Sequence, residues 1–259
     1  MEDFILFEMK DQVACITLNR PQAFNSFNRP MALQLQSILD SCEKDESVRA
    51  ILLTGNGKAF CAGQDLAEAT DSNGPELQTI VQEHYNPIIR KIRAIEKPVI
   101  AAVNGVAAGA GANIALACDL TIAHENAAFI QAFSKIGLIP DSGGTYFLPR
   151  IIGVQKALAL MLTGDKISAK DAEELNMIYK CISDEEFESV TTKLAEKLAL
   201  MPTRAFGLTK KAVNQSLNNS LEEQLKLEEK LQTEAGKTED FQEGVQAFLE
   251  KRKAKFKGK

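Results

Sequence analysis

Residues 98–123, PVIAAVNGVAAGAGANIALACDLTIA, decide the fold class of this chain. Pro98–Val103 has the pattern of a buried strand, and an Asn-Gly pair ends it. Gly109–Ala117 is small and apolar on nearly every side, which is typical of a helix packed deep in a core. Leu120–Ala123 predicts a further strand. This succession indicates an α/β protein with parallel strands and helices on both faces of a sheet.

The same alternation extends toward the N-terminus, whereas strand signals fade after about Pro149 and helical patterns dominate. Ser168 is expected to cap a helix over Ser168–Glu174, with Asp171 as the acid three residues on. We find no internal repeat and no low-complexity linker. The other expected elements are strands at Val13–Leu18 and Ala50–Leu53 and helices at Met31–Glu43, Leu77–Ile95, Glu185–Leu200 and Ser220–Thr233.

Composition narrows the class of protein. The 259 residues are 45% hydrophobic and 25% charged, which excludes a disordered, collagen-like or coiled-coil chain. The net charge of −5 argues against a dedicated nucleic-acid binder. The first residues do not resemble a signal peptide, and no stretch resembles a membrane span. Five cysteines without a CxxC pair are typical of reduced thiols, so we expect a cytoplasmic protein without a metal site.

Common catalytic motifs are missing from the sequence. It has no GxSxG, HExxH or GxxxxGK[ST], and residues 105–111 do not make a clean GxGxxG. His84 and His124 lie in no nucleophile motif, and we expect both to be structural or on the surface.

Two segments rich in small residues, Ala59–Asp65 and Ala107–Ala112, carry a more specific signal. Unpaired N–H groups at a helix start are donors that the helix dipole reinforces. Two such donors could converge on a thioester oxygen and form an oxyanion hole. The alternative is that small residues only permit close packing of helix against sheet.

Seven motifs in order resemble those of the crotonase, or enoyl-CoA hydratase/isomerase, superfamily, and the resemblance covers nearly the whole chain. It implies a crotonase-like spiral of ββα units over residues 1–200 and a C-terminal helical trimerisation region over residues 201–259. It also implies a homotrimer or a dimer of trimers. The motifs are ITLNRP (16–21), KAFCAGQDL (58–66), KPVIAAVNG (97–105), CD (118–119), GGT (143–145), LTG (162–164) and FLEKRK (248–253).

The resemblance also implies roles for individual residues. The oxyanion donors would be the main-chain N–H groups of Gln64 and Ala110. CoA would be part of the substrate, and no separate cofactor or metal is implied. The CoA-binding positions would be Gln22, Ala23, Ala62, Asp65 and Leu66, together with Phe248 and Lys251, which in this fold reach the CoA of a neighbouring subunit.

Two departures from the hydratases bear on the reaction. Hydratases of this family use two glutamates to activate water, and the corresponding positions here are Asn113 and Phe133. Neither side chain can accept a proton at neutral pH. The sequence therefore argues against hydration by a two-glutamate mechanism.

A different carboxylate stands in the loop IGLIPDSGGT (136–145), which lines the active site in this family. Asp141 could be an ordinary turn residue after a proline. Because the other carboxylates are missing, we instead expect Asp141 to be the acid/base residue of an isomerase. Burial beside Phe133, Ile130 and Leu138 would raise its pKa toward a useful range.

The same loop resembles that of the ring-epoxide isomerases of phenylacetate breakdown, as do AGAGAN (108–113) and HYNP (84–87). This implies conversion of 1,2-epoxyphenylacetyl-CoA to oxepin-CoA, with a 3-enoyl-CoA to 2-enoyl-CoA shift. Alternatives are a linear-chain 3-enoyl-CoA isomerase of fatty-acid oxidation and a non-catalytic subunit that binds CoA thioesters. RNA binding through the basic tail Lys251–Lys259 is a further class, which the acidic overall charge disfavours.

Overall fold

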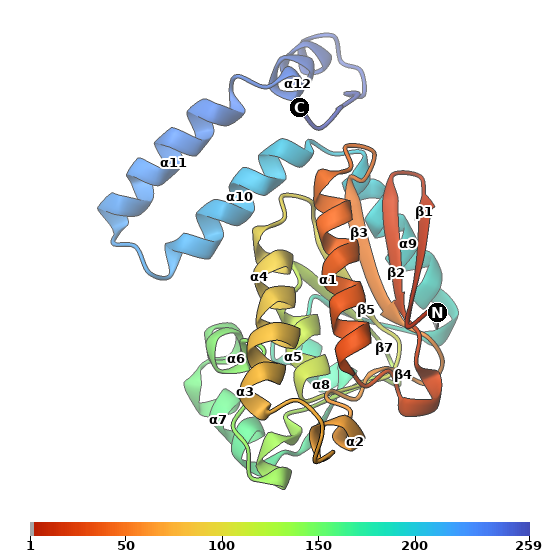
Figure 1. The fold of residues 1–259 in the computed structure, drawn as a ribbon. Coiled ribbons are helices and arrows are strands. Elements are labelled where there is room, and N and C mark those ends of the chain that lie inside the picture. The colour runs from red at the N-terminus through yellow and green to blue at the C-terminus, as the bar shows by residue number, and fades with distance from the viewer. Residues whose placement is uncertain (1–2) are drawn as a thin grey trace.

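The computed structural model describes residues 3–259, which form two β-sheets covered by helices and a helical C-terminal arm (Figure 1). The larger sheet has the strand order β1-β2-β3-β5-β7-β10. Strand β1 runs antiparallel to β2, and the other neighbouring pairs are parallel. These strands are Ile5–Lys10, Val13–Leu18, Ala50–Gly55, Val99–Val103, Leu120–His124 and Lys180–Ile182.

The smaller sheet has the order β4-β6-β8-β9. In each of the pairs β3–β4, β5–β6 and β7–β8, the first strand lies in the larger sheet and the second in the smaller sheet. The chain therefore passes from one sheet to the other within each pair. Helix α5 (Ala110–Ala117) follows β6 and completes a ββα unit. The strands of this sheet are Ala59–Cys61, Val106–Ala108, Ala128–Ile130 and Lys166–Ser168.

Both faces of the larger sheet are covered by helices, as the sequence predicts. Since side chains alternate along a strand, Val13, Ala50 and Ile100 pack on helix α9 (Asp184–Ala199). Their neighbours Ala14, Ile51 and Ala101 belong to the main core on the opposite face. The helices α1 (Arg29–Lys44), α4 (Asn86–Ala94) and α5 contribute buried residues to that core.

The helical pattern at Leu77–Ile95 does not form one regular helix. It divides into α3 (Leu77–Thr79), the π-helix η2 (Ile80–Tyr85) and α4. Pro87 has no N–H to continue a regular hydrogen-bond ladder, which accounts for an irregular turn just before α4. The π-turn ends at Tyr85, which is fully buried.

The prediction that strands fade after Pro149 needs correction, because β9 and β10 lie beyond it. Each has three residues and pairs at a sheet edge, which is too short for a periodic signal. The predicted cap is confirmed, since Ser168 Oγ accepts the Asp171 N–H at 3.1 Å at the start of α8 (Ala169–Glu174). The helices before it are α6 (Gly144–Ile152) and α7 (Val154–Thr163).

Three helices form the C-terminal arm, α10 (Thr203–Ser216), α11 (Leu221–Ala235) and α12 (Glu239–Leu249). Figure 1 shows α11 and α12 at the end of the molecule opposite α2 (Leu66–Ala69). The arm is joined to the sheets by an ion pair in which Lys210 Nζ lies 2.7 Å from Asp119 Oδ2. Only 11% of the Lys210 side chain and 16% of the Asp119 side chain is exposed, so solvent screens this pair weakly.

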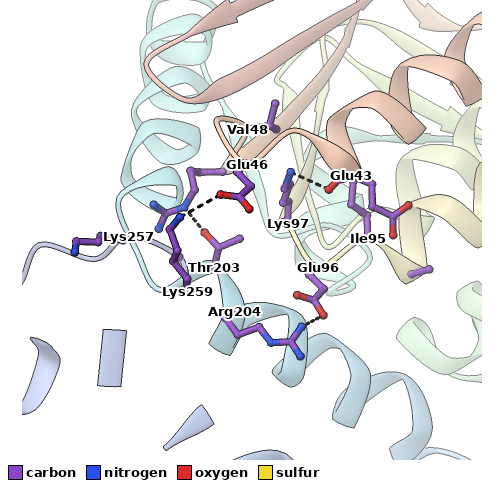
Figure 2. A pocket seen from close by; sticks show the side chains of 13 residues that line it. Glu43, Glu46, Val48, Ile95, Glu96, Lys97, Thr203, Arg204, Lys257 and Lys259 are labelled. Carbon is purple, nitrogen blue, oxygen red and sulfur yellow. Dashed lines mark hydrogen bonds and ion pairs between the residues drawn. The ribbon is translucent and has the colours of Figure 1, made fainter. Parts of the chain in front are cut away.

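The basic tail folds back on the arm and the core. Asp240, which is 3% exposed, accepts the main-chain N–H groups of Lys257 and Gly258 at 2.6 and 2.7 Å. Arg49, which is also buried, donates to the side chain of Thr203 and to the carbonyl of Met201. A pocket of about 360 Å³ lies at this junction. Most of the side chains that line it are acidic or basic (Figure 2). None of its lining residues is a predicted catalytic or CoA-binding residue.

Replacing Asp240 with alanine is expected to release the tail and to lower the free energy of unfolding by about 3 kcal/mol. The loss follows because two main-chain N–H groups would lose a charged acceptor, the carboxylate of the buried Asp240. Denaturant unfolding measures the change. Glu239→Ala is the control, since this exposed neighbour makes only an ion pair with Lys257 and should cost less than about 1 kcal/mol. Equal losses in both variants would contradict a special role for Asp240.

Candidate active site

The segment after β4 has a backbone shape that requires glycine. Gly63 has a φ of +96°, and a Cβ there would lie 2.9 Å from the carbonyl oxygen of Ala108. That same Cβ position is 3.4 Å from the main-chain nitrogen of Ala110. Because no side chain intervenes, the segment carrying Gln64 lies directly against the start of α5.

The direction of the Gln64 N–H follows from a single β-bridge to Phe27. Phe27 donates its N–H to the carbonyl of Gly63 at 2.7 Å and accepts the N–H of Asp65 at 2.8 Å. In a parallel bridge of this register, the N–H of the middle residue points away from the partner strand. The Gln64 N–H has no acceptor among residues 3–259.

Helix α5 supplies the second donor. Gly109, with a φ of +53°, donates its N–H to the carbonyl of Ile130 and turns the chain into the helix. The Ala110 N–H stands in the first turn and has no acceptor within the described chain. Two unpaired donors beside a helix N-terminus are suited to stabilise a negatively charged oxygen. The structure thus brings Gln64 and Ala110 together.

Asp141 is positioned by contacts to its main chain. Its carbonyl oxygen accepts the Asn113 side-chain amide at 2.9 Å and the Gly144 N–H at 2.8 Å. Since Asn113 lies one turn after Ala110 in α5, this contact holds the Asp141 loop close to the candidate oxyanion donors. The Asp141 carboxylate itself accepts the Ser142 hydroxyl at 2.8 Å.

Burial raises the pKa of Asp141 above its ordinary value, and the hydrogen bond from Ser142 opposes part of that shift. The residues expected to form an apolar wall differ in burial. Phe133 is buried, with ring atoms 3.8–3.9 Å from the Cβ position at Gly109, whereas Leu138 is 39% exposed. A carboxylate with a raised pKa is a stronger base when it is ionised.

A Ser142→Ala variant should move the acidic limb of the pH–activity curve to higher pH. A base works only when it is deprotonated, so activity falls as pH drops through the pKa of Asp141. Removing the Ser142 hydroxyl takes away a stabilising contact to the ionised form and raises that pKa further. The measurement is kcat/KM against pH, with Ser216→Ala in α10 as the control. A limb at unchanged pH would show that another group titrates.

Asn113 stands at one of the two positions where hydratases have glutamate, and Phe133 stands at the other. Asn113 is 1% exposed and uses both ends of its amide, because its oxygen accepts the Gln131 side chain at 2.8 Å. Its role in the structure is therefore to fasten α5 to the loops that carry Gln131 and Asp141.

Comparison with known proteins agrees with this fold and these loops. A family model described as "Enoyl-CoA hydratase/isomerase" matches residues 8–259. The chain belongs to this family. It is 47% identical to the 1,2-epoxyphenylacetyl-CoA isomerase of Escherichia coli (strain K12), with 100% of each chain covered. It is 38% identical to the trans-2-decenoyl-[acyl-carrier-protein] isomerase of Streptococcus mutans, with 98% of each covered.

A solved structure matches as well. The crystal structure of an enoyl-CoA hydratase from Bacillus anthracis has a TM-score of 0.91 and 34% identity, covering 99% of this chain and 100% of that one. The resemblance to the crotonase superfamily and the expected crotonase-like fold are thus confirmed. The protein is an enzyme of the enoyl-CoA hydratase/isomerase family.

The structure brings together five of the predicted CoA-binding residues, which are Gln22, Ala23, Ala62, Asp65 and Leu66. Gln22 and Ala23 lie in the short helix η1 (Pro21–Ala23), and the carbonyl of the next residue accepts the Ala62 N–H at 2.9 Å. Leu66 is 53% exposed beside them. Asp65 has a structural task as well, because it caps α2 and pairs with Arg20 at 2.8 Å, which holds its pKa low despite burial.

Phe248 and Lys251 do not join this cluster. Phe248 lies in the last turn of α12 and Lys251 just beyond it. Figure 1 shows α12 at the end of the molecule opposite α2. Phe248 is 82% exposed, so its ring is free to contact another molecule.

Sequence reasoning missed Tyr85. Its hydroxyl donates to the Gln64 side-chain oxygen at 2.7 Å, and burial raises its pKa well above the ordinary value, with a smaller contribution from the charge of Asp141. Tyr85 belongs to the HYNP stretch (84–87), which resembles the ring-epoxide isomerases but did not indicate a role for this side chain.

The remaining reactive side chains of the family's site are poor candidates for chemistry. Burial raises the pKa of Cys61 to about 12, so its thiol stays protonated at neutral pH. No three or more His, Cys, Asp or Glu side chains gather into a metal-binding group within residues 3–259. In the same range, every helix is too short or too polar to cross a membrane.

Proposed function

We propose that this enzyme is an acyl-CoA isomerase in which Asp141 is the sole carboxylate acid/base. The observation that carries the proposal is the half-buried Asp141, whose main chain is held by the side chain of Asn113. Asn113 itself stands at a position where a hydratase would carry glutamate. The N–H groups of Gln64 and Ala110 would hold the thioester oxygen. Their lack of other acceptors supports this role.

The reaction moves a proton and a double bond. With a 3-enoyl-CoA, the Asp141 carboxylate removes a proton from C2, between the thioester and the alkene. The electron pair spreads over a dienolate whose oxygen accepts the two N–H groups. Asp141 then returns the proton at C4, which leaves the conjugated 2-enoyl-CoA. The proposed reaction needs no metal or redox cofactor, and CoA enters as part of the substrate.

For the acyl group we propose a ring, with 1,2-epoxyphenylacetyl-CoA as substrate and oxepin-CoA as product. Support comes from the 1,2-epoxyphenylacetyl-CoA isomerase of Escherichia coli, to which this chain is 47% identical over its whole length. The ring conversion leaves the composition of the thioester unchanged, as an isomerisation must. The second candidate is a linear enoyl thioester, which the 38% identical decenoyl isomerase supports.

The test supplies the purified protein with three thioesters. A linear 3-enoyl-CoA is followed by ultraviolet absorbance of the conjugated product, 1,2-epoxyphenylacetyl-CoA by chromatography, and a 2-enoyl-CoA by its loss on hydration. We expect turnover of the first two and negligible hydration. Fast hydration would overturn the isomerase proposal, and turnover of the linear substrate alone would assign the linear-chain reaction. Thioester binding without any turnover would indicate a non-catalytic subunit.

We also propose that the enzyme is a homotrimer or a dimer of trimers. The arm exposes large apolar side chains that a single chain leaves uncovered, and two grooves of about 470 and 660 Å³ run along it. In such an assembly Phe248 and Lys251 would reach the CoA of a neighbour. Light scattering at several concentrations tests this, and a monomer would refute it. The exposed side chains are Val213, Leu217, Leu221, Leu225, Phe241, Val245, Phe248 and Leu249.

A further inference from the structure

The side chain of Gln64 is held at both ends of its amide. Its oxygen accepts the Tyr85 hydroxyl at 2.7 Å. Its nitrogen donates to Glu68 Oε2 at 3.1 Å and to the carbonyl of Asp65 at 3.2 Å. Glu68 is in turn fixed by the Arg29 N–H, which it accepts at 2.8 Å. These contacts leave the Gln64 side chain little freedom to rotate.

Tyr85 is itself held rigidly. It is fully buried at the end of the π-helix, and its ring makes an edge-to-face contact with Phe27 at a centroid distance of 6.0 Å. Phe27 is also the residue whose main chain bridges Gln64. One aromatic pair therefore supports Gln64 from two sides, with Phe27 on the main chain and Tyr85 on the side chain.

We infer that Tyr85 is a positioning residue, whose hydroxyl fixes Gln64 so that the Gln64 main-chain N–H points at the substrate's thioester oxygen. This inference rests on the proposed function, because it assigns a purpose to the contact within the candidate oxyanion hole. The bridge to Phe27 sets the direction of the Gln64 N–H, but it is an isolated bridge outside the two sheets. The Tyr85 hydroxyl adds a second anchor through the side chain, which keeps Gln64 from shifting away from Ala110.

The electrostatic surroundings keep the hydroxyl in its donating form. Desolvation raises the pKa of Tyr85 well above the ordinary value, and the nearby carboxylates Asp141, Glu68 and Asp65 act in the same direction. The phenol therefore remains protonated over the whole pH range in which the enzyme would work. A phenol that stays protonated at neutral pH can hold the Gln64 oxygen whatever the protonation state of Asp141.

The expected consequence is a selective loss in the chemical step. Oxyanion donors act mainly where charge develops, so a misaimed N–H lowers kcat more than it weakens substrate binding. Tyr85→Phe keeps the ring and its contact with Phe27 and removes only the hydroxyl. We expect kcat for a linear 3-enoyl-CoA to fall about tenfold while KM stays within threefold.

The experiment compares wild type, Tyr85→Phe and the control Tyr146→Phe, whose ring is 38% exposed and stacks on Arg150. Kinetics are combined with binding of 4-dimethylaminocinnamoyl-CoA, a conjugated thioester whose absorption moves to longer wavelength when donors polarise its carbonyl. We expect wild type and Tyr146→Phe to give a full shift, and Tyr85→Phe to bind the probe with most of the shift lost. Glu68→Gln, which weakens the other end of the Gln64 amide, should give a smaller loss of the same kind.

The outcomes separate this inference from the proposed function. If wild type shifts the probe but does not turn over enoyl-CoA, the isomerase proposal fails while the loss of shift in Tyr85→Phe still supports positioning. If Tyr85→Phe only lowers the unfolding temperature and keeps the wild-type kcat and shift, Tyr85 is structural and the inference is overturned. A wild type that binds the probe without any shift would also overturn it.

Discussion

Asp141→Asn should reduce isomerase turnover by about 10²–10⁴-fold, the usual contribution of a positioned acid/base group. Asparagine has nearly the same shape but cannot take a proton from C2 of the substrate. The loop should stay in place, because Asn113 and Gly144 contact the main chain of Asp141 and not its carboxylate. Thioester binding is therefore expected to be retained while turnover is lost.

Stability provides an independent check on the same variant. A carboxylate whose pKa is raised on folding costs stability once the pH lies above that pKa, because the folded state then holds an ion that burial disfavours. The cost is absent below the unfolded pKa and grows as the pH rises through the folded one. Asp141→Asn removes the ion, so the free energy of unfolding at neutral pH should increase.

The measurements are initial rates with a 3-enoyl-CoA and denaturant unfolding at neutral pH. Asp165→Asn serves as the control, since Asp165 is exposed beyond α7 and takes no part in the site. Turnover within threefold of wild type would remove Asp141 from the mechanism. Lost turnover with lowered stability would instead indicate that the carboxylate supports the loop.

The sequence predicts most of the long elements because they carry repeated signals. Residues 98–123 give β5, α5 and β7 at nearly the predicted bounds, since β5 and α5 are buried throughout and β7 is buried in its middle residues. Ser168 marks a helix start correctly, because a cap is a local hydrogen bond that neighbouring residues determine. Resemblance, and not periodicity, led to Gln64, Ala110 and Asp141.

What the sequence does not predict depends on contacts between distant segments. Strands such as β4 and β9 have three residues and exist only because a partner strand lies beside them. The tie between Asp240 and the tail, and that between Tyr85 and Gln64, join residues 17–21 positions apart that share no periodic pattern. Tyr85 also stands at the end of a π-turn, and the regular helical pattern of residues 77–95 gave no sign of it.

Gly63→Ala is expected to lower the kcat of the isomerase by at least about 10²-fold. Removing one oxyanion donor costs about that much in acyl-transfer enzymes. The added methyl would meet the Ala108 carbonyl at 2.9 Å, at a φ of +96° that side-chain-bearing residues rarely adopt. Relief requires the segment to move away from α5, which separates the Gln64 N–H from that of Ala110.

The control for Gly63→Ala must show strain without this displacement, and Gly153→Ala provides it. Gly153 has a φ of +79° between α6 and α7, and no atom lies within 4 Å of the position its Cβ would occupy. Both variants should lose about 1–3 kcal/mol of stability from backbone strain. Only Gly63→Ala should also lose kcat and the absorption shift of a bound cinnamoyl thioester. If Gly63→Ala kept its kcat, the Gln64 N–H would not be an oxyanion donor. If kcat fell in both variants, general destabilisation would explain the loss. Gly153→Ala leaves the two donor N–H groups in place, so it should not lower kcat through their geometry.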